Sequence, residues 1–265
     1  MKIIEYFKSE NQSYWREEIG KSDWSAGPYL ARQLENGNFR KVCGETAEVL
    51  LLCEDAELIS FCIYAEKDDN GISDPSMKPW AGFVYTFPKH RGKRRIGKLL
   101  EHVYALAKKD GYERVYLSTS EVGLYEKYGC TFLKMMTTAE GEKERIYTLN
   151  IENRDYGDVL GKVVSGTADR PMGTAHPDYP DLVYPVNYGF VDNVFAADGE
   201  EQDVYILGAD RPLERFTGKV AAVWHRLNDN EDKWIVNLKD EPLTADEIKE
   251  AIAFQEQYFM GELYL

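Results

Sequence analysis

The sequence has no long apolar run and few cysteines, and these absences exclude several classes of protein. No uninterrupted apolar stretch approaches the roughly 20 residues that a membrane-spanning helix needs. The first residues, MKIIEYFKSENQSY, carry charges where a signal peptide has an apolar core. The four cysteines stand singly within apolar segments, without a CxxC pair or a cysteine-histidine cluster at metal spacing, which is typical of reduced core thiols. We therefore expect a soluble, cytoplasmic protein with no membrane partner.

Basic residues are scarce in the second part of the chain. Residues 151–265 hold 10 Lys plus Arg against 23 Asp plus Glu, so they carry −13 of the net charge of −14. Such an acidic surface repels nucleic acid, because nucleic-acid binding depends on neutralising phosphates with cations, and it suits divalent metal ions better. The change in charge coincides with the polar stretch IENRDYGD at 151–158. The sequence therefore predicts two domains, 1–150 and 156–265, and no nucleic-acid partner.

The first domain alternates strand and helix patterns. TAEVLLLCEDAELISFCIYAEKDD predicts a strand hairpin that turns near Glu54 to Glu57, and PWAGFVYTF and RVYLSTS predict further strands. Between these two strands the loop HRGKR opens a helix, and CTFLKMM with RIYTLNI predicts a closing hairpin. The apolar face of this helix comprises Ile96, Leu99, Leu100, Val103 and Leu106. The order indicates an α/β sheet with the helix start exposed, where amide groups without intrahelical partners attract anions such as phosphate.

Basic side chains surround this helix start. They are Lys89, Arg91, Lys93, Arg94 and Arg95. On charge alone, a solvated basic loop explains them as well as an anion site does. FPKHRGKRRIGKLL, followed further along the chain by GLYEKYGCTFL, resembles the GNAT N-acetyltransferases, in which an Arg-rich loop and a helix start cradle the pyrophosphate of acetyl-CoA. The resemblance covers most of residues 1–150.

The resemblance implies which residues hold the cofactor. Arg91 stands at the first residue of the family's Arg/Gln-x-x-Gly-x-Gly/Ala loop, and Gly97 comes one step after the second small-residue position, which is Ile96 here. The strand before the loop is expected to offer its backbone to the pantetheine arm. The implied cofactor-binding residues are Val84, Thr86, Arg91, Gly92, Lys93, Arg94 and Gly97.

The resemblance also implies a catalytic acid. Tyr125 in LYEKYG matches the tyrosine that protonates the CoA thiolate as it leaves, although an aromatic anchor of a short helix would explain it too. The nucleophile must be a neutral amine, so a base or a water chain has to remove its proton. Glu121 and Glu66 are candidates that the spacing does not separate, and the acceptor amine is not readable from the sequence.

The second domain contains short strands followed by one helix. DVLGKVVSG, DVYILG, KVAAVWHRL and KWIVNL predict strands, and strands of this length with turn signals indicate a small barrel. The helix is expected to begin at Thr244-Ala-Asp-Glu247, which fits a capping box. Its residues at helical spacing are Ile248, Ile252, Gln255 and Phe259.

Two acidic loops lie at strand ends of this domain. DGEEQD at 198–203 precedes the apolar run 204–207, and NDNEDK at 228–233 joins two predicted strands. Two carboxylates about 6 Å apart repel by about 3 kcal/mol at an effective dielectric constant of about 20, so the loops must face water or share a cation. Solvation explains the first loop alone, and a polar turn explains the second. Two such loops facing each other would form an oxygen-rich Mg²⁺ site.

VYPVNYGFVDNVFAADGEEQDVYILG resembles the soluble, Mg²⁺-dependent inorganic pyrophosphatases, whose fold is an OB-type barrel, and the match covers most of residues 157–265. The resemblance implies that Glu200 activates the attacking water. The implied metal ligands are Asp198, Asp203, Asp229 and Asp232. The implied phosphate-binding residues are Tyr188, Lys233 and Tyr258. Two positions depart from the family, since Glu200 replaces an Asp and Phe259 replaces a phosphate-binding Lys.

The sequence thus predicts an α+β protein of two domains, a GNAT mixed α/β sheet followed by an OB-type β-barrel with a C-terminal helix. The expected activities are N-acetylation of a small-molecule amine with acetyl-CoA and Mg²⁺-dependent hydrolysis of pyrophosphate or another phosphorylated metabolite. One alternative is a barrel that binds a phosphorylated metabolite or a partner without catalysis. Another is a pair of ligand-binding sensors without turnover. The edge of the closing hairpin leaves a homo-oligomer open.

Overall fold

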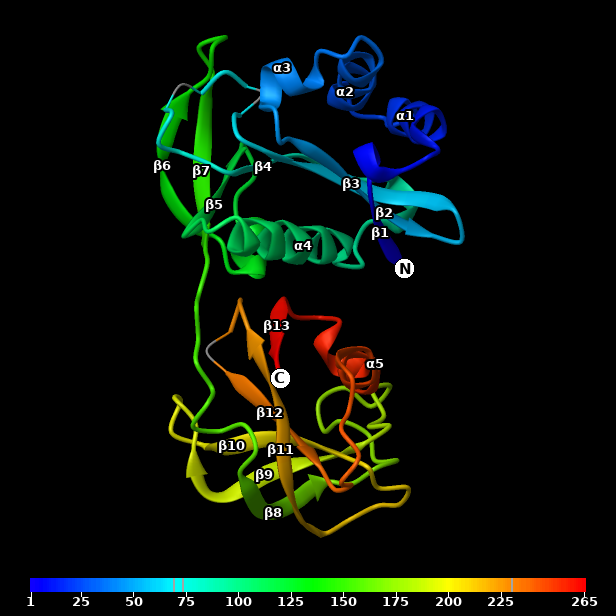
Figure 1. Ribbon diagram of the computed structural model, residues 1–265, viewed down its shortest axis with the longest axis vertical. Coiled ribbons are helices and arrows are strands. Elements are labelled where there is room, and N and C mark those ends of the chain that lie inside the picture. The colour runs from blue at the N-terminus through cyan, green and yellow to red at the C-terminus, as the bar shows by residue number, and fades with distance from the viewer. Residues whose placement is uncertain (69, 73, 230) are drawn as a thin grey trace. The chain divides into compact units, whose positions relative to one another are not determined.

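The chain folds into two compact units, Met1–Glu152 and Asn153–Leu265, each with its own sheet (Figure 1). The structure is a computed structural model that describes residues 1–68, 70–72, 74–229 and 231–265. Residue 230, inside the predicted turn at 228–233, therefore lies outside the described residues. Within the described residues, no helix has the length and apolar character needed to cross a membrane.

The amino-terminal unit is built on a seven-stranded sheet with the order β1-β2-β3-β4-β5-β7-β6. Its strands are β1 (Lys2–Glu5), β2 (Glu48–Glu54), β3 (Glu57–Ala65), β4 (Trp80–Thr86), β5 (Arg114–Thr119), β6 (Thr131–Thr137) and β7 (Lys143–Asn150). Its helices are α1 (Gln12–Gly20), α2 (Ala26–Glu35), α3 (Phe39–Cys43) and α4 (Arg95–Lys109). Short 3-10 helices are η1 (Tyr6–Lys8), η2 (Pro88–His90) and η3 (Tyr125–Tyr128). The predicted hairpins are confirmed as β2–β3 and β6–β7.

Helices cover both faces of this sheet, with α1, α2 and α3 on one face and α4 on the other (Figure 1). Trp15 and Ile19 of α1 and Leu30 of α2 join the core on the first face. On the second face, α4 buries Leu99, Leu100 and Val103 as its spacing predicts. Ile96 and Leu106 are only half-buried, and Tyr104 and Ala107 complete the buried face instead. The sheet is thus a middle layer, and the start of α4 follows the end of its central strand β4.

The strands β4 and β5 separate soon after they meet. They run parallel, whereas the other neighbouring strands of this sheet run antiparallel, and their register covers the single pair Trp80 and Tyr116. Beyond this pair, no further register between β4 and β5 exists among the described residues. A parallel strand that separates from its neighbour leaves backbone N–H and C=O groups available to another extended chain.

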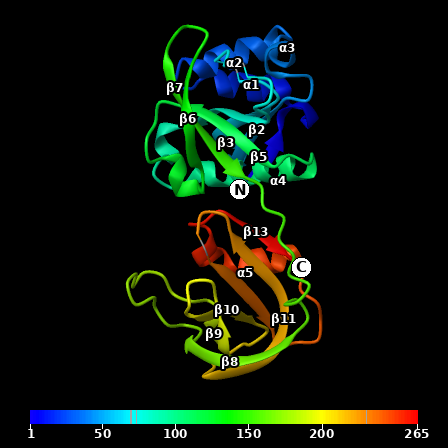
Figure 2. The ribbon, with the colours of Figure 1, turned by 90° about the vertical axis from the view of Figure 1, so that its left-hand side faces the viewer.

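Five strands of the carboxyl-terminal unit close into a barrel, which confirms the predicted fold class (Figure 2). The strands are β8 (Val163–Arg170), β9 (Asn187–Phe195), β10 (Glu201–Leu207), β11 (Arg215–Arg226) and β12 (Asp232–Asn237). The ring closes because β11 pairs with β8 through its first half and with β12 through its second half. The short strand β13 (Gly261–Tyr264) extends the sheet beside β11.

The helix α5 (Ala245–Glu256) of this unit begins where the sequence predicts. Thr244 Oγ1 accepts a hydrogen bond from the Glu247 N–H, and the Glu247 carboxylate accepts one from the Thr244 N–H, which completes the capping box. Ile248 and Ile252 pack against the barrel. Phe259 lies beyond the end of the helix rather than on its apolar face, so the predicted helical repeat is too long by one member.

Candidate functional site

The start of α4 presents backbone amides and cations to water. Arg91, Gly92, Lys93 and Arg94 are exposed. Gly92 has φ +76° and Arg94 has φ +51°, and these two left-handed residues turn the chain into the helix. Gly92 reaches this conformation without steric cost, whereas a left-handed Arg is uncommon. No side chain caps this helix start among the described residues, so its first amides remain available to an anion.

The strand that precedes this loop is distorted next to Val84. Phe83 has φ +48°, and the pairing of β3 with β4 shifts register in this region. A β-bulge redirects the side chains around it and is frequent beside active sites. Val84 and Thr86 are half-buried on the strand that separates from β5. The backbone of β4 and the start of α4 are therefore both found near the carboxyl-terminal end of β4, in the middle of the sheet.

Arg91, in the loop after β4, contacts three groups. Its Nε donates to the Thr86 carbonyl oxygen at 2.9 Å, and its NH2 donates to Asp23 Oδ1 at 3.1 Å. Its guanidinium lies 5.5 Å from the ring centre of Tyr85. The side chain is nevertheless 52% exposed, so its charge is accessible from solvent.

Tyr125 is the first residue of η3 and is buried. Desolvation by burial, together with the nearby Cys130, raises the pKa of its phenol well above the ordinary value. Tyr125 therefore keeps its proton at neutral pH, which is the state that a general acid requires. Its ring centre lies 6.2 Å from that of Tyr147 of β7.

The two candidate bases differ in their surroundings. Glu66 Oε1 accepts hydrogen bonds from both the Thr46 hydroxyl at 2.6 Å and the Thr46 N–H at 2.9 Å, and these bonds lower the pKa of Glu66. A carboxylate with a lowered pKa is a weaker base. Glu121 is exposed in the segment between β5 and η3. The geometry thus favours Glu121 over Glu66 without bringing either next to a defined acceptor.

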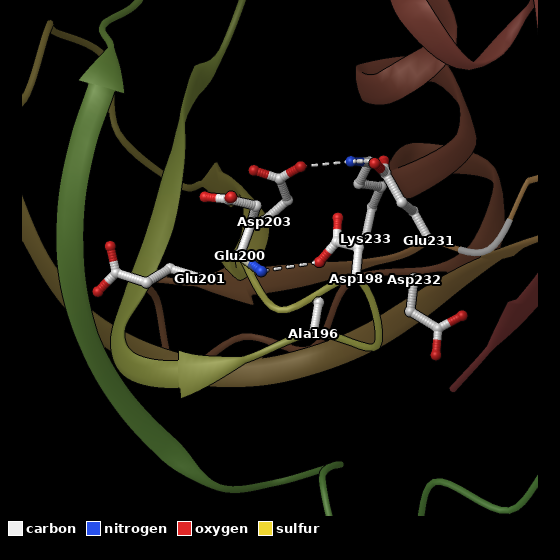
Figure 3. Close-up of a pocket in the computed structure, with 8 residues that line it drawn as sticks. All are labelled: Ala196, Asp198, Glu200, Glu201, Asp203, Glu231, Asp232 and Lys233. Atoms are coloured by element: carbon white, nitrogen blue, oxygen red, sulfur yellow. Dashed lines mark hydrogen bonds and ion pairs between the residues drawn. The ribbon is translucent and has the colours of Figure 1, made fainter.

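In the carboxyl-terminal unit, the two acidic loops meet in one pocket (Figure 3). The pocket encloses about 200 Å³ and is lined by Ala196, Asp198, Glu200, Glu201, Asp203, Glu231, Asp232 and Lys233. It therefore brings together Asp198, Glu200, Asp203 and Asp232, as the sequence predicts. Glu231 belongs to the pocket and was not among the predicted residues. Asp229 does not line the pocket. Its Oδ2 instead accepts a hydrogen bond from Arg226 NH1 at 3.2 Å.

Lys233 lies between two of the carboxylates that line the pocket. Its ammonium forms ion pairs with both Asp203 and Glu231, and its side chain is only 3% exposed (Figure 3). The arrangement follows from the barrel, since β10 and β12 pair in parallel with Val204 opposite Trp234, which places the preceding residues side by side. A buried ammonium between two carboxylates neutralises them at short range.

Asp232 turns away from the other carboxylates of the pocket (Figure 3). Its Oδ1 is 2.7 Å from His225 Nδ1, and its Oδ2 accepts a hydrogen bond from the Tyr156 hydroxyl at 2.8 Å. Burial alone would raise the pKa of Asp232, but the hydrogen bonds from His225 and Tyr156 outweigh it and lower that pKa. Both oxygens are therefore engaged within the protein.

These donors do not fit a magnesium ion as they stand. Mg²⁺ needs near-octahedral oxygen ligands at about 2.0–2.1 Å, whereas Asp203 is paired with Lys233 and Asp232 with His225 and Tyr156. In the part of the chain that the structure describes, no group of three His, Cys, Asp or Glu side chains is placed to hold a metal ion. The expected Mg²⁺ site is thus not supported by the geometry.

Two of the predicted phosphate-binding residues, Tyr188 and Lys233, are engaged with Asp203. Tyr188 is buried, and burial together with the nearby charge of Asp203 and a hydrogen bond to that residue raises the pKa of Tyr188. Tyr258 is 50% exposed and follows α5. Lys233 is engaged with carboxylates. The three side chains therefore do not form a ready-made cluster of phosphate donors.

A second buried cation escaped the sequence analysis. Arg226 makes a two-pronged contact with Glu256, from Nε at 2.9 Å and from NH2 at 2.7 Å, and Tyr205 donates to the same carboxylate at 2.5 Å. The ring of Phe259 lies 3.5 Å from the guanidinium carbon. Phe259 thus covers Arg226 from the position where a phosphate-binding Lys was expected. A basic residue in a strand is a weak sequence signal, so its partner on α5 was not predictable locally.

A comparison with protein families finds a match within the amino-terminal unit. The model described as an acetyltransferase (GNAT) domain matches residues 71–133, from the segment before β4 to β6. The chain carries a GNAT domain. This domain contains the separating strands, the basic helix start and Tyr125. A comparison with curated proteins gave no match.

Solved structures resemble each unit at low sequence identity. The aminoglycoside 6'-N-acetyltransferase from Enterococcus faecium is 12% identical, with a TM-score of 0.43, over 58% of this chain and 99% of that one. The inorganic pyrophosphatase from Ehrlichia chaffeensis is 15% identical, with a TM-score of 0.32, over 43% of this chain and 92% of that one. The inorganic pyrophosphatase from Neisseria gonorrhoeae is 19% identical, with a TM-score of 0.31, over 39% and 81%. These similarities do not indicate what the GNAT domain or the barrel acts on.

Proposed function

We propose that the protein transfers an acetyl group from acetyl-CoA to the amine of a small molecule, and that the GNAT domain carries this reaction. The observation that carries the proposal is the occurrence of two features near the carboxyl-terminal end of the central strand β4. There β4 separates from β5 after a single pair, and the uncapped start of α4 lies next to it in the chain. The first feature suits an extended arm that pairs with a strand, and the second suits a pyrophosphate.

The residues at the end of β4 and the start of α4 fit the cofactor. The backbone of Val84 and Thr86 would hold the pantetheine arm, while the side chain of Arg91 would pair with a phosphate oxygen. The remaining implied contacts are Gly92, Lys93, Arg94 and Gly97. Gly97 is buried in α4 and supports close packing of the helix start, and the exposed Lys93 and Arg94 add positive charge.

Bound acetyl-CoA supplies the activated acetyl thioester. The contribution of Tyr125 is a phenolic proton, which its raised pKa keeps on Oη at neutral pH and which it would donate to the CoA sulfur as the thioester bond breaks. Glu121, which is exposed, is the better placed of the two carboxylates to accept a proton from the acceptor amine, directly or through water.

The transferase proposal is tested by binding and turnover. Acetyl-CoA should raise the melting temperature of the full chain, and Arg91→Ala should reduce this shift. Arg32→Ala is the matched control, because Arg32 is exposed on α2 and belongs to no proposed site. CoA release with a panel of primary amines then identifies acceptors. No stabilisation at millimolar acetyl-CoA would remove the proposal.

For the barrel, the sequence favours a Mg²⁺-dependent inorganic pyrophosphatase, but the geometry supports a non-catalytic module better. The decisive observation is the buried ammonium of Lys233 between Asp203 and Glu231, where a hydrolase would need a metal ion. A module that binds a phosphorylated metabolite or a partner makes no such demand.

Phosphate release separates these two functions of the barrel. We expect the full chain to release no phosphate from pyrophosphate above the blank, with or without Mg²⁺, and Asp203→Ala to behave identically. Release that requires Mg²⁺ and disappears in Asp203→Ala would establish the hydrolase instead. The GNAT activity serves as an internal control for correct folding of the sample.

A further inference from the structure

An ion pair in the GNAT domain joins the turn between α1 and α2 to the loop before α4. Asp23 lies in this turn, and its Oδ1 accepts a hydrogen bond from Arg91 NH2 at 3.1 Å across 68 positions of sequence. The turn consists of residues 21–25 and connects two helices on one face of the sheet. A long-range contact of this kind fixes the turn against the loop between β4 and α4, which contains Arg91.

Tyr85 of β4 holds the same carboxylate. Its hydroxyl donates to Asp23 Oδ1 at 2.5 Å, and it accepts a hydrogen bond from the Asp23 N–H at 3.2 Å. The hydrogen bond from Tyr85 and the charge of Arg91 lower the pKa of Asp23, so it is a carboxylate at neutral pH. Trp24, the next residue, lies nearly parallel to Tyr85, with ring centres 6.1 Å apart. The turn is thus attached to β4 through two adjacent residues.

Arg91 is arranged to receive one anion. Its Nε is fixed on the Thr86 carbonyl oxygen and its guanidinium lies over Tyr85, so the NH2 group is the edge that meets Asp23. Carboxylates and phosphates are the anions that a guanidinium binds best, and both accept hydrogen bonds from the same N–H groups. The two side chains are 52% and 57% exposed, so an incoming phosphate can reach both.

We propose that Asp23 is a resident anion for Arg91, which occupies the guanidinium until a pyrophosphate oxygen of the cofactor replaces it. This inference rests on the proposed acetyl-CoA site. Because an exposed ion pair contributes little net free energy, the exchange is easy. Arrival of the cofactor then removes the Arg91 contact from the 21–25 turn and leaves the contacts of the turn with Tyr85 and Phe83. Asp23 thereby couples occupancy of the phosphate site to the freedom of the turn between α1 and α2.

The test is a calorimetric titration of the full chain with CoA at low ionic strength. Asp23→Asn removes the competing charge and should lower the Kd by about twofold to fivefold, the range expected for an exposed ion pair. Asp55→Asn is the matched control, because Asp55 is an exposed aspartate in the turn between β2 and β3, and its Kd should equal that of the unsubstituted chain. Arg91→Ala should weaken binding, and adding Asp23→Asn to it should change nothing further.

A second measurement follows the turn itself. Hydrogen exchange of the amides at 21–25 should become faster when CoA is added to the unsubstituted chain, and should be fast already in Asp23→Asn. A Kd for Asp23→Asn that equals or exceeds the unsubstituted value, while that chain binds CoA, overturns the inference alone. Slower exchange of the turn on CoA binding also overturns it. Absence of CoA binding by the unsubstituted chain overturns the proposed transferase together with it.

Discussion

The GNAT domain keeps the cations of its site in water, whereas the barrel buries its own. Arg91 is 52% exposed and pairs with a carboxylate that is equally accessible. Lys233 and Arg226 have side chains that are 3% and 4% exposed, and each meets carboxylates from other parts of the barrel. Exposed pairs exchange partners at little cost, while a buried pair is expensive to break. The Arg91 pair can therefore exchange partners, whereas two carboxylates of the barrel pocket already share a buried ammonium.

The comparison shows that clustered charge in a sequence does not identify a ligand by itself. The basic loop at 89–95 and the acidic loop at 198–203 both look like binding sites, but what matters is whether an opposite charge is buried beside them. In the barrel, the ammonium of Lys233 is buried beside Asp203 and Glu231.

Arg226→Ala should be the most damaging substitution. It leaves Glu256, whose side chain is 3% exposed, as an unpaired buried charge, and breaking a buried pair in this way costs about 3–5 kcal/mol. The effect should appear as lost hydrogen-exchange protection of the β10 and β12 amides. Arg215→Ala is the control, since its pair with Asp192 has an Arg that is 63% exposed and is worth at most about 1 kcal/mol. Equal losses from both variants would erase the contrast between buried and exposed pairs.

Tyr125→Phe should lower kcat at least about 100-fold, the smaller end of the range for a lost general acid. The ring and its packing remain, so the Kd for acetyl-CoA should not change. Tyr128→Phe is the matched control, because Tyr128 is a buried tyrosine in the same short helix and has no proposed role. If Tyr128→Phe loses as much activity, or Tyr125→Phe loses none, the acid is another group.

Lys233→Met should convert the closed pocket into one that accepts a divalent cation. The unsubstituted chain should melt at the same temperature with Mg²⁺ or with EDTA, whereas the variant should be stabilised by Mg²⁺, by about 1.4 kcal/mol at tenfold excess over its Kd. The reason is that Asp203 and Glu231 lose their shared ammonium. Lys239→Met, an exposed change at the end of β12, controls for loss of charge. Stabilisation of the unsubstituted chain by Mg²⁺ would show that the pocket is open after all.

Local signals in the sequence were sufficient for the strands and helices that contain them. The β2–β3 hairpin, the basic start of α4 and the capping box at Thr244 each depend on residues close together in the chain. Helices α1 to α3 were not predicted, and α1 shows why. It buries only Trp15 and Ile19, so its apolar pattern is too sparse to recognise without the sheet beneath it.

The charge pairs that decide the two sites depend on contacts distant in sequence. Lys233 meets Asp203 across 30 positions because β10 and β12 pair in parallel with one particular register. Asp23 meets Arg91 across 68 positions because α1 packs over β3 and α2 over β4. The resemblance to pyrophosphatases implied roles for Asp203 and Lys233 but could not show that they neutralise each other. The register of a barrel is a tertiary property, so their pairing required the structure.

The smallest expected effect concerns how stability depends on pH in the barrel. The folded state lowers the pKa of Asp232 below the ordinary 3.8, because bonds from His225 and Tyr156 outweigh burial. As pH falls through 3.8 the unfolded chain therefore takes up a proton first, and the contribution of Asp232 to stability is lost. Asp169 is the opposite case, since burial raises its pKa and its cost disappears as pH falls. Unfolding free energies of Asp232→Asn and Asp169→Asn, each subtracted from the unsubstituted values across acid pH, should give slopes of opposite sign. Slopes of the same sign would mean that Asp232 is not held as a carboxylate by its two partners.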